Sequence, residues 1–308
     1  MLIEIDGADD MRPLPTLRQL RYLTALAEHL HFGRAAEACL ATQSTLSAGL
    51  QELETILGVT LVERTKRKVM LTPLGEQVVT RARVVLRGAE DIADLAAAST
   101  EALSGPLRLG VIPTIAPYLL PHALPSLRQR YPALRLFLRE DLTARLLDRL
   151  ATGDLDAALI ALPWPSPEIE TMHIADDGFM LACPPGHPLA LRPDLSAADL
   201  IDQDLLLLEE GHCLRDHALS ACHLPGPAKG EGVLGTSLAT LVQMVANGLG
   251  VTLLPEMAVK SGVLAGTDVV TRPLRGAGSR GIGLAWRPSS PRKAEFRLLG
   301  EALKAGFQ

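Results

Sequence analysis

Apolar residues recur at every third or fourth position near the N-terminus of the chain, which is the spacing of amphipathic helices. Two such helices are predicted, over residues 17–30 and 34–41. A third is predicted to begin after Thr42, whose side chain suits a helix N-cap, and to end at Gly58. Its leucines leave free a face that begins with small polar residues: Gln43, Ser44, Thr45 and Ser47. Two short helices joined by a turn, the second opening on hydrogen-bonding side chains, are the pattern of a helix-turn-helix.

The next segment, residues 59–75, alternates like two short strands around a basic turn, which predicts a wing beside the helix-turn-helix. Its cations suit contacts with phosphates: Arg64, Lys66, Arg67 and Lys68. An isolated run of charge is more often a solvated surface loop. Directly after a helix-turn-helix, however, it favours binding to double-stranded DNA.

A long helix is predicted from Leu74 to about residue 104. Small and apolar residues recur along it at spacings of four and three: Val78, Ala82, Val85, Ala89, Ile92, Ala96, Ser99 and Leu103. A helix packed on its own domain is one interpretation. Charged residues occupy the neighbouring positions, so a seam about 45 Å long between two copies in a coiled coil is favoured. A homodimer also suits a winged helix that reads symmetric half-sites.

From residue 105 onward, short apolar runs alternate with helical patterns, which predicts an α/β domain with a parallel sheet covered by helices. The proline-rich stretch 163–167 is predicted to cross between two α/β halves, and the chain is predicted to return near 272–276. The expected division is subdomain I at 105–162 and 276–308, with subdomain II at 163–275. Ligands of such folds bind between the halves, beyond the carboxyl ends of strands.

Composition narrows the class of protein. The formal net charge of −5 argues against nonspecific binding of polyanions by the whole molecule and confines DNA binding to one basic cluster. No apolar run is long enough to span a bilayer, and the N-terminus lacks the features of a secretory signal. We therefore expect a cytoplasmic protein whose four cysteines are thiols. The expected domains are a disordered leader at 1–11, a winged helix-turn-helix at 12–73, a linker helix at 74–104 and an effector domain at 105–308.

Two of the four cysteines lie in one helical pattern, GHCLRDHALSAC, at Cys213 and Cys222. Nine residues of α-helix give roughly 13.5 Å of rise and about 900° of turn, so the two thiols point to opposite sides. A disulfide needs Cα atoms within roughly 7 Å. The pair can therefore join only if part of this helix unwinds. Cys39 and Cys183 are expected to be inert core residues.

Cys213 is predicted to fall in the first turn of this helix, after a strand that ends near Glu210. Unpaired N–H groups and the helix dipole at that position favour a low-pKa, accessible thiolate, to which His212 and Arg215 can add positive charge. Such a thiolate attacks peroxide and becomes a sulfenic acid, which a second thiol converts to a disulfide. The Pro- and Gly-rich stretch 223–232 can move without disrupting a core. Local unwinding would then act as a switch.

The run from Leu17 to about Leu86, which contains FGRAAEACLATQSTLSAGLQELETILGVTLVERT and LTPLG, resembles the winged helix of LysR-type transcriptional regulators. The resemblance implies that Gln43, Ser44, Thr45 and Ser47 meet base edges and nearby phosphates, and that Arg34 and the wing cations hold the backbone. It implies a periplasmic-binding-protein-like effector domain of two α/β subdomains. It also implies a homotetramer built from two coiled-coil dimers, with RNA polymerase as a partner.

Four further stretches, IPTIAPYLLP, LTARLL, EEGHCLRDHALSAC and TSLATLVQMVANGLGVTLLP, resemble the hydrogen peroxide-sensing members of this family. This resemblance implies that Cys213 is the peroxidatic and Cys222 the resolving cysteine. It assigns peroxide binding or thiolate orientation to Thr114, Thr143, Gly211, His212 and Asp216, and bracing of the reduced loop to Arg215. The chain departs from the pattern at Gly232 and Leu234, where a histidine and a basic residue are expected.

Three alternatives to a redox-sensing regulator use the same residues. A metal sensor would use zinc-ligand types at His212, Cys213, Cys222 and His223, but these pairs straddle a helix instead of sharing a turn. A LysR-type regulator of metabolism would bind a small molecule in the effector cleft beside Thr114. A thiol peroxidase would need turnover with a reductant. We expect neither enzyme activity nor a cofactor or metal.

Overall fold

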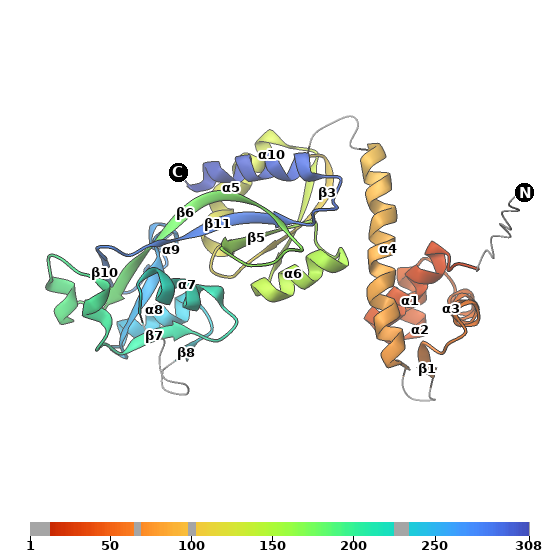
Figure 1. Ribbon diagram of the computed structural model, residues 1–308, viewed down its shortest axis with the longest axis horizontal. Helices are drawn as coiled ribbons and strands as arrows, with labels where there is room; N and C mark the ends of the chain where they lie inside the picture. Colours follow the sequence, from red (N-terminus) through yellow and green to blue (C-terminus); the bar gives the residue numbers. More distant parts are fainter. Residues whose placement is uncertain (1–12, 65–68, 98–102, 225–233, 308) are drawn as a thin grey trace, which may run out of the picture. The chain divides into compact units, whose positions relative to one another are not determined.

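The computed structural model describes residues 13–64, 69–97, 103–224 and 234–307 (Figure 1). The chain divides into two compact units, residues 1–93 and 94–308. No helix of the described residues combines the length and apolar character needed to cross a bilayer.

The first unit is a winged helix-turn-helix. Its elements are α1 (Leu17–His29), α2 (Phe32–Ala38), α3 (Gln43–Leu57), β1 (Val62–Arg64), β2 (Val69–Leu71) and α4 (Pro73–Ala97). Thr42 caps α3 by accepting the backbone N–H of Thr45, and Gly58 ends the helix with φ at 68°. The two strands pair antiparallel as the predicted wing. Of the four predicted wing cations, only Arg64 lies within the described residues, and Lys66, Arg67 and Lys68 lie outside them.

Leucines of α1 and α3 form the core of this unit together with Ala35 and Ala36 of α2, and Leu23, Leu26, Leu46 and Leu53 are completely buried. Burial of apolar area at this level contributes about 1.5–3 kcal/mol for each leucine side chain. The Glu54 carboxylate accepts the backbone N–H groups of Leu61 and Val62 and so fixes the wing to α3. The three predicted helices are confirmed, each within a few residues of its expected ends.

The residues of the predicted coiled-coil stripe on α4 lie in two different environments. Ala82 is buried and Val78 half-buried against the core of the first unit, as the alternative interpretation expected. Val85 and Ile92, further along, are 50% and 72% exposed. Leu103 is wrong as a seam residue, because it is 1% exposed and packs in the core of the second unit. Ser99 lies outside the described residues.

The second unit is built on one mixed sheet of nine strands within the described residues, in the order β4-β3-β5-β11-β6-β9-β7-β8, with β10 beside β6. The strands are β3 (Gly105–Val111), β4 (Leu134–Glu140), β5 (Ala157–Leu162), β6 (Glu170–Cys183), β7 (Leu205–Leu208), β8 (Leu234–Gly235), β9 (Val251–Pro255), β10 (Val270–Pro273) and β11 (Ser279–Trp286). Helices pack against it: α5 (Ala116–Arg130), α6 (Thr143–Thr152), α7 (Cys213–Ala221), α8 (Leu238–Ala246), α9 (Glu256–Lys260) and α10 (Lys293–Lys304).

The prediction of an all-parallel sheet is wrong at the junction of the two halves. The long strand β6 pairs antiparallel with β11 through Gly178 and with β9 beyond it, so the chain passes between subdomains inside a strand (Figure 1). The proline-rich segment 163–167 only leads into β6. The return lies between β10 and β11. A strand can make this passage because both of its halves are hydrogen-bonded, the first to β11 and the second to β9 and β10.

Two separate hydrophobic cores lie on either side of this junction. The core of subdomain I contains β3, β5, part of α5 and α10, with Trp286 and Phe296 at its centre. The core of subdomain II contains the second half of β6, α8 and β9. Helix α7 contributes side chains to both cores. The candidate site lies along this helix, between the two subdomains.

Candidate functional site

Cys213 begins α7, as the sequence predicts. Strand β7 ends at Leu208, Gly211 turns the chain with φ at 96°, and His212 is the N-cap residue. A positive φ of this size strains any residue with a Cβ, so glycine suits this turn. The turn is closed by the His212 N–H, which donates to the carbonyl oxygen of Glu209 at 3.3 Å.

The Cys213 thiol faces subdomain I, although the rest of α7 packs on subdomain II. Cys213 is 8% exposed and belongs to the core of subdomain I. The Thr143 hydroxyl, at the start of α6 and also buried, donates to Cys213 Sγ at 3.5 Å. The structure therefore brings together Thr143 and Cys213, which lie 70 residues apart in the sequence.

The prediction of a low-pKa, accessible thiolate is wrong for this state of the protein. Burial raises the pKa of the Cys213 thiol above its ordinary value, and this outweighs the opposing effects of the Thr143 hydrogen bond and the Arg280 charge. A thiolate loses most of its hydration inside a core, and nearby N–H dipoles replace only part of it. His212 supplies no cation, because burial lowers its pKa, although Glu209 acts in the opposite direction.

Cys222 lies at the other end of the same helix, as its C-cap residue. It is 1% exposed and packs in the core of subdomain II, and burial raises the pKa of its thiol. Both cysteines are free thiols. The intact helix between them and their assignment to different cores agree with the predicted separation.

A buried arginine that the sequence analysis did not single out joins the site to the subdomain junction. Arg280 on β11 is 1% exposed. Its guanidinium donates to Asp177 Oδ2 at 2.9 and 3.0 Å, to Thr114 Oγ1 at 2.9 Å and to the Thr114 carbonyl at 3.0 Å. Asp177 also accepts the backbone N–H of Met257. One ion pair therefore links β6, β11, α9 and the turn after β3.

The sequence signal for this pair is weak, because Arg280 lies near the start of β11 beside Ser279, and Asp177 on β6 follows Asp176, which is exposed. Charged residues are almost never fully buried without a partner. Burial of Arg280 and Asp177 therefore depends on the ion pair that the structure shows between them. Their pairing could not be predicted, because it depends on the antiparallel register that places Arg280 opposite Asp177.

The remaining residues assigned to the peroxide pocket are more open. Asp216 is exposed, and Arg215, which was assigned to bracing the reduced loop, is half-exposed on α7. Within the described part of the chain, neither side chain has a recorded ion pair or hydrogen bond. Leu234 pairs with Leu207 in the β7–β8 ladder, and Gly232 and most of the stretch 223–232 lie outside the described residues.

The predicted DNA-contacting residues share one end of the helix-turn-helix. Gln43, Ser44 and Thr45 are exposed and Ser47 is half-exposed on the first turns of α3. The Ser44 and Thr45 hydroxyls lie 2.9 and 2.7 Å from that of Thr42, the cap residue. Arg34 on α2 is exposed, and its guanidinium donates to the His29 carbonyl.

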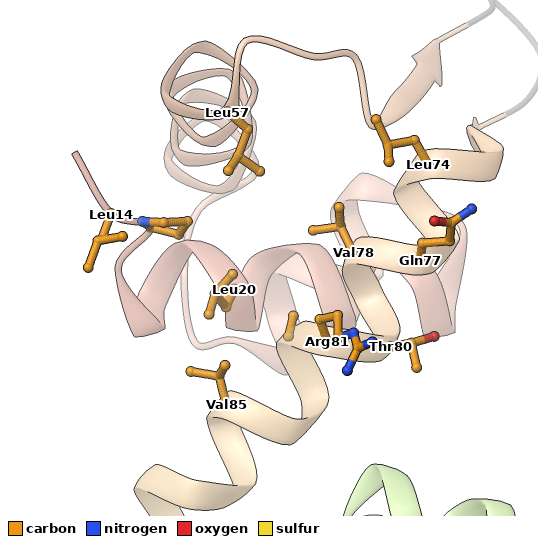
Figure 2. Close-up of a pocket in the computed structure, with 11 residues that line it drawn as sticks. Leu14, Leu20, Leu57, Leu74, Gln77, Val78, Thr80, Arg81 and Val85 are labelled. Carbon is orange, nitrogen blue, oxygen red and sulfur yellow. The ribbon is translucent and has the colours of Figure 1, made fainter. Parts of the chain in front are cut away.

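An apolar pocket of about 720 Å³ lies between α1, α3 and α4 of the first unit (Figure 2). Leu14, Leu20, Leu57, Leu74, Val78 and Val85 line it, with Gln77 and Arg81 at α4. Val78 and Val85 belong to the predicted seam. Elsewhere, within the ranges that the structure describes, no three His, Cys, Asp or Glu side chains gather as a metal site would require.

The chain matches two family descriptions. Residues 17–76 match "Bacterial regulatory helix-turn-helix protein, lysR family", and residues 100–308 match "LysR substrate binding domain". Among curated relatives, the HTH-type transcriptional regulator EstR of Acinetobacter baylyi is 43% identical over 96% of this chain and 98% of its own. The DNA-binding transcriptional dual regulator OxyR of Escherichia coli is 43% identical over 94% and 95%.

Two solved structures are also similar. A full-length OxyR variant from Pseudomonas aeruginosa, with a cysteine replaced by aspartate, has 41% identity and a TM-score of 0.79, and the match covers 95% of each chain. A cysteine-to-serine variant of Corynebacterium glutamicum OxyR bound to hydrogen peroxide has 38% identity and a TM-score of 0.67, and the match covers 96% of this chain and 94% of that one.

Proposed function

The chain belongs to the LysR family of bacterial helix-turn-helix regulators, and from this premise we propose that it is a transcriptional regulator that senses hydrogen peroxide through Cys213 and Cys222. The observation that carries the proposal is the position of these two thiols. They lie at the two ends of one helix, in two different cores, and are free. The similarity to OxyR proteins supports the choice of oxidant.

The chemistry has two steps. The Cys213 thiolate attacks one oxygen of hydrogen peroxide, the O–O bond breaks, and the products are a sulfenic acid and hydroxide. The Cys222 thiolate then attacks the sulfenic sulfur, and the S–O bond breaks with release of water after protonation. Peroxide is reduced by two electrons, and the two thiols become one disulfide.

The residues around Sγ have separate roles in the first step. The Thr143 hydroxyl and the Arg280 charge both lower the pKa of Cys213 and so favour the reactive thiolate against the effect of burial. Arg280 also holds Thr114 through its side chain and carbonyl. We assign Thr114, Thr143, Gly211, His212 and Asp216 to the peroxide site, and Arg215 to bracing the reduced loop.

The second step requires a change of structure. A disulfide needs Cα atoms within roughly 7 Å, whereas the two ends of α7 are about 13.5 Å apart along an intact helix. Cys213 must leave the core of subdomain I, and at least part of α7 must unwind. Because α7 packs on both subdomains, its unwinding changes the contacts that it makes with each of them. This change is the physical basis of the proposed switch.

DNA binding belongs to the first unit. We propose that Gln43, Ser44, Thr45 and Ser47 of α3 meet base edges and nearby phosphates, and that Arg34 and the wing cations contact the backbone. The exposed apolar residues Val85 and Ile92 and the pocket beside α4 support assembly through α4 of a second copy into a homodimer. A homotetramer in the cytoplasm and contact with RNA polymerase complete the proposal.

The test is peroxide treatment of the full-length protein, followed by peptide mapping without reductant and footprinting of both redox forms on promoter DNA. We expect one peptide pair linked through Cys213 and Cys222, together with a changed footprint. Cys213→Ser should abolish both effects, whereas Cys183→Ser, at another buried thiol, should abolish neither. If Cys213→Ser still responds and a small metabolite changes the footprint, the protein is instead a metabolite sensor.

A further inference from the structure

A second side chain of α7, besides Cys213, contacts subdomain I. His217 Nε2 lies 3.4 Å from the carbonyl oxygen of Pro163, which follows β5. A carbonyl oxygen only accepts hydrogen bonds, so Nε2 carries the proton and donates. His217 comes four residues after Cys213, and the two side chains therefore share one face of the helix. Two successive turns of α7 are held to subdomain I on this face.

The surroundings of His217 favour the neutral ring. Its Nδ1 is buried and has no hydrogen-bond partner among the described residues. Burial lowers the pKa of His217, Arg280 lowers it further, and the Pro163 carbonyl and Asp216 act in the opposite direction. A neutral imidazole with its proton on Nε2 leaves a lone pair on Nδ1, so the buried atom without a partner is an acceptor.

The other buried side chains of α7 pack on subdomain II. Leu214, Ala218 and Cys222 all belong to that core. Cys213 and His217 are thus the side chains that attach the first turns of α7 to the opposite subdomain, and at the end of the helix the Ala221 carbonyl accepts the Gly278 N–H just before β11. If the first two turns are the part of α7 that unwinds, both of their contacts with subdomain I are lost when Cys213 moves to Cys222.

We propose that His217 is a positioning residue for the thiol switch: its Nε2–H bond to Pro163 holds the first turns of α7 on subdomain I and so favours the dithiol over the Cys213–Cys222 disulfide. The inference rests on the proposed function. A bond present in only one of two states shifts their equilibrium by its own net free energy.

The test compares two full-length variants, His217→Gln and His217→Phe. The glutamine amide nitrogen lies the same number of bonds from Cα as Nε2 and donates to a carbonyl, whereas phenylalanine keeps a ring and donates nothing. Both variants lack the buried Nδ1, and of the two only His217→Gln can donate to the Pro163 carbonyl. Each is equilibrated with mixtures of reduced and oxidised dithiothreitol, and the Cys213–Cys222 disulfide is quantified by thiol alkylation and mass spectrometry.

We expect the disulfide in His217→Phe to be favoured about two- to tenfold over His217→Gln, the range of one hydrogen bond, with His217→Gln within about twofold of the native protein. Equal equilibrium constants for the two variants, or an order opposite to this one, would overturn the inference. If the native protein forms no such disulfide, the proposed function fails separately. In that case the His217–Pro163 contact is tested by amide hydrogen exchange of peptides covering α7 in the dithiol form. The contact predicts faster exchange in His217→Phe than in His217→Gln.

Discussion

At the scale of single residues, Cys213 is subject to opposing electrostatic effects. Its position at the start of α7, the Thr143 hydroxyl and the Arg280 guanidinium favour the thiolate, while burial favours the thiol and prevails. A buried thiol is protected from general oxidants, and its reactivity with peroxide depends on the few groups that stabilise its charge. Among them, the Thr143 hydroxyl donates a hydrogen bond to Sγ at 3.5 Å.

Replacing Thr143 by valine should slow the reaction of Cys213 with peroxide. Valine has nearly the same shape but cannot donate to Sγ, and a hydrogen bond to a charged group contributes about 1.5–3 kcal/mol. We expect the second-order rate constant at neutral pH to fall roughly tenfold to a hundredfold by that figure, as measured by stopped-flow thiol loss in the Cys222→Ser background.

Thr152→Val is the matched control, because Thr152 ends the same helix and donates only to the Arg149 carbonyl. Its rate constant should equal that of the parent. A Thr143→Val rate constant equal to that of Thr152→Val would show that the hydroxyl does not stabilise the reacting sulfur.

At the scale of elements, α4 changes its environment along its length. Its first turns pack on the core of the helix-turn-helix, whereas Val85 and Ile92 are exposed. Large exposed apolar residues in a row at heptad-like spacing indicate an interface between copies. α7 also divides its side chains, in this case between two cores of one unit. On α4 the exposed apolar residues are available for an interface between copies. On α7 the residues that pack on subdomain I are those that the proposed switch would displace.

The double substitution Val85→Asp and Ile92→Asp should separate the proposed dimer without unfolding the first unit. Burying two carboxylates in an apolar seam costs several kcal/mol, whereas both positions tolerate charge in the monomer. We expect a lower mass in sedimentation equilibrium and a footprint that weakens at least tenfold. Val84→Asp is the control, since Val84 is 47% exposed and lies beside the seam stripe. An unchanged mass for the double variant would contradict assembly through this face.

At the scale of the whole molecule, buried thiols lie in both cores of the second unit. Cys213 belongs to subdomain I, while Cys183 and Cys222 belong to subdomain II, and burial raises the pKa of all three. Folding therefore keeps these groups protonated at pH values where the unfolded chain ionises them. The stability of the dithiol form is linked to pH through this difference.

The free energy of unfolding should decrease as the pH rises above about 8.5, the ordinary thiol pKa. Below that pH the thiols are protonated in both the folded and the unfolded protein and add no pH dependence to stability. Above it the unfolded protein binds fewer protons than the folded one, which favours unfolding by up to about 1.4 kcal/mol per thiol and pH unit. Urea unfolding between pH 8 and 10 with reductant measures this dependence.

Cys183→Ala provides the comparison, because it removes one buried thiol far from the proposed chemistry. Its unfolding free energy should decrease less steeply with pH than that of the native chain. If the unfolding free energies of the two proteins depend on pH in the same way, Cys183 has the same pKa in the folded and the unfolded chain.

Local order follows directly from the sequence. The three helices of the first unit, the cap at Thr42, the turn at Gly58 and the start of α7 at Cys213 were all predicted, because each depends on residues within one or two helical turns. The separation of Cys213 from Cys222 is likewise a property of nine consecutive helical residues. The contact of Thr143 with Cys213 was implied only by resemblance to a family.

Tertiary structure decided what depends on distant segments. It buried Cys213 in subdomain I and so reversed the expected direction of its pKa, because desolvation by a core outweighs the dipole of one helix. It paired Arg280 with Asp177 across two antiparallel strands, and it moved Leu103 from a helical seam into a core. Hydrophobic spacing tells which side of an element is buried, whereas the partner that buries it is chosen by the packing of the whole chain.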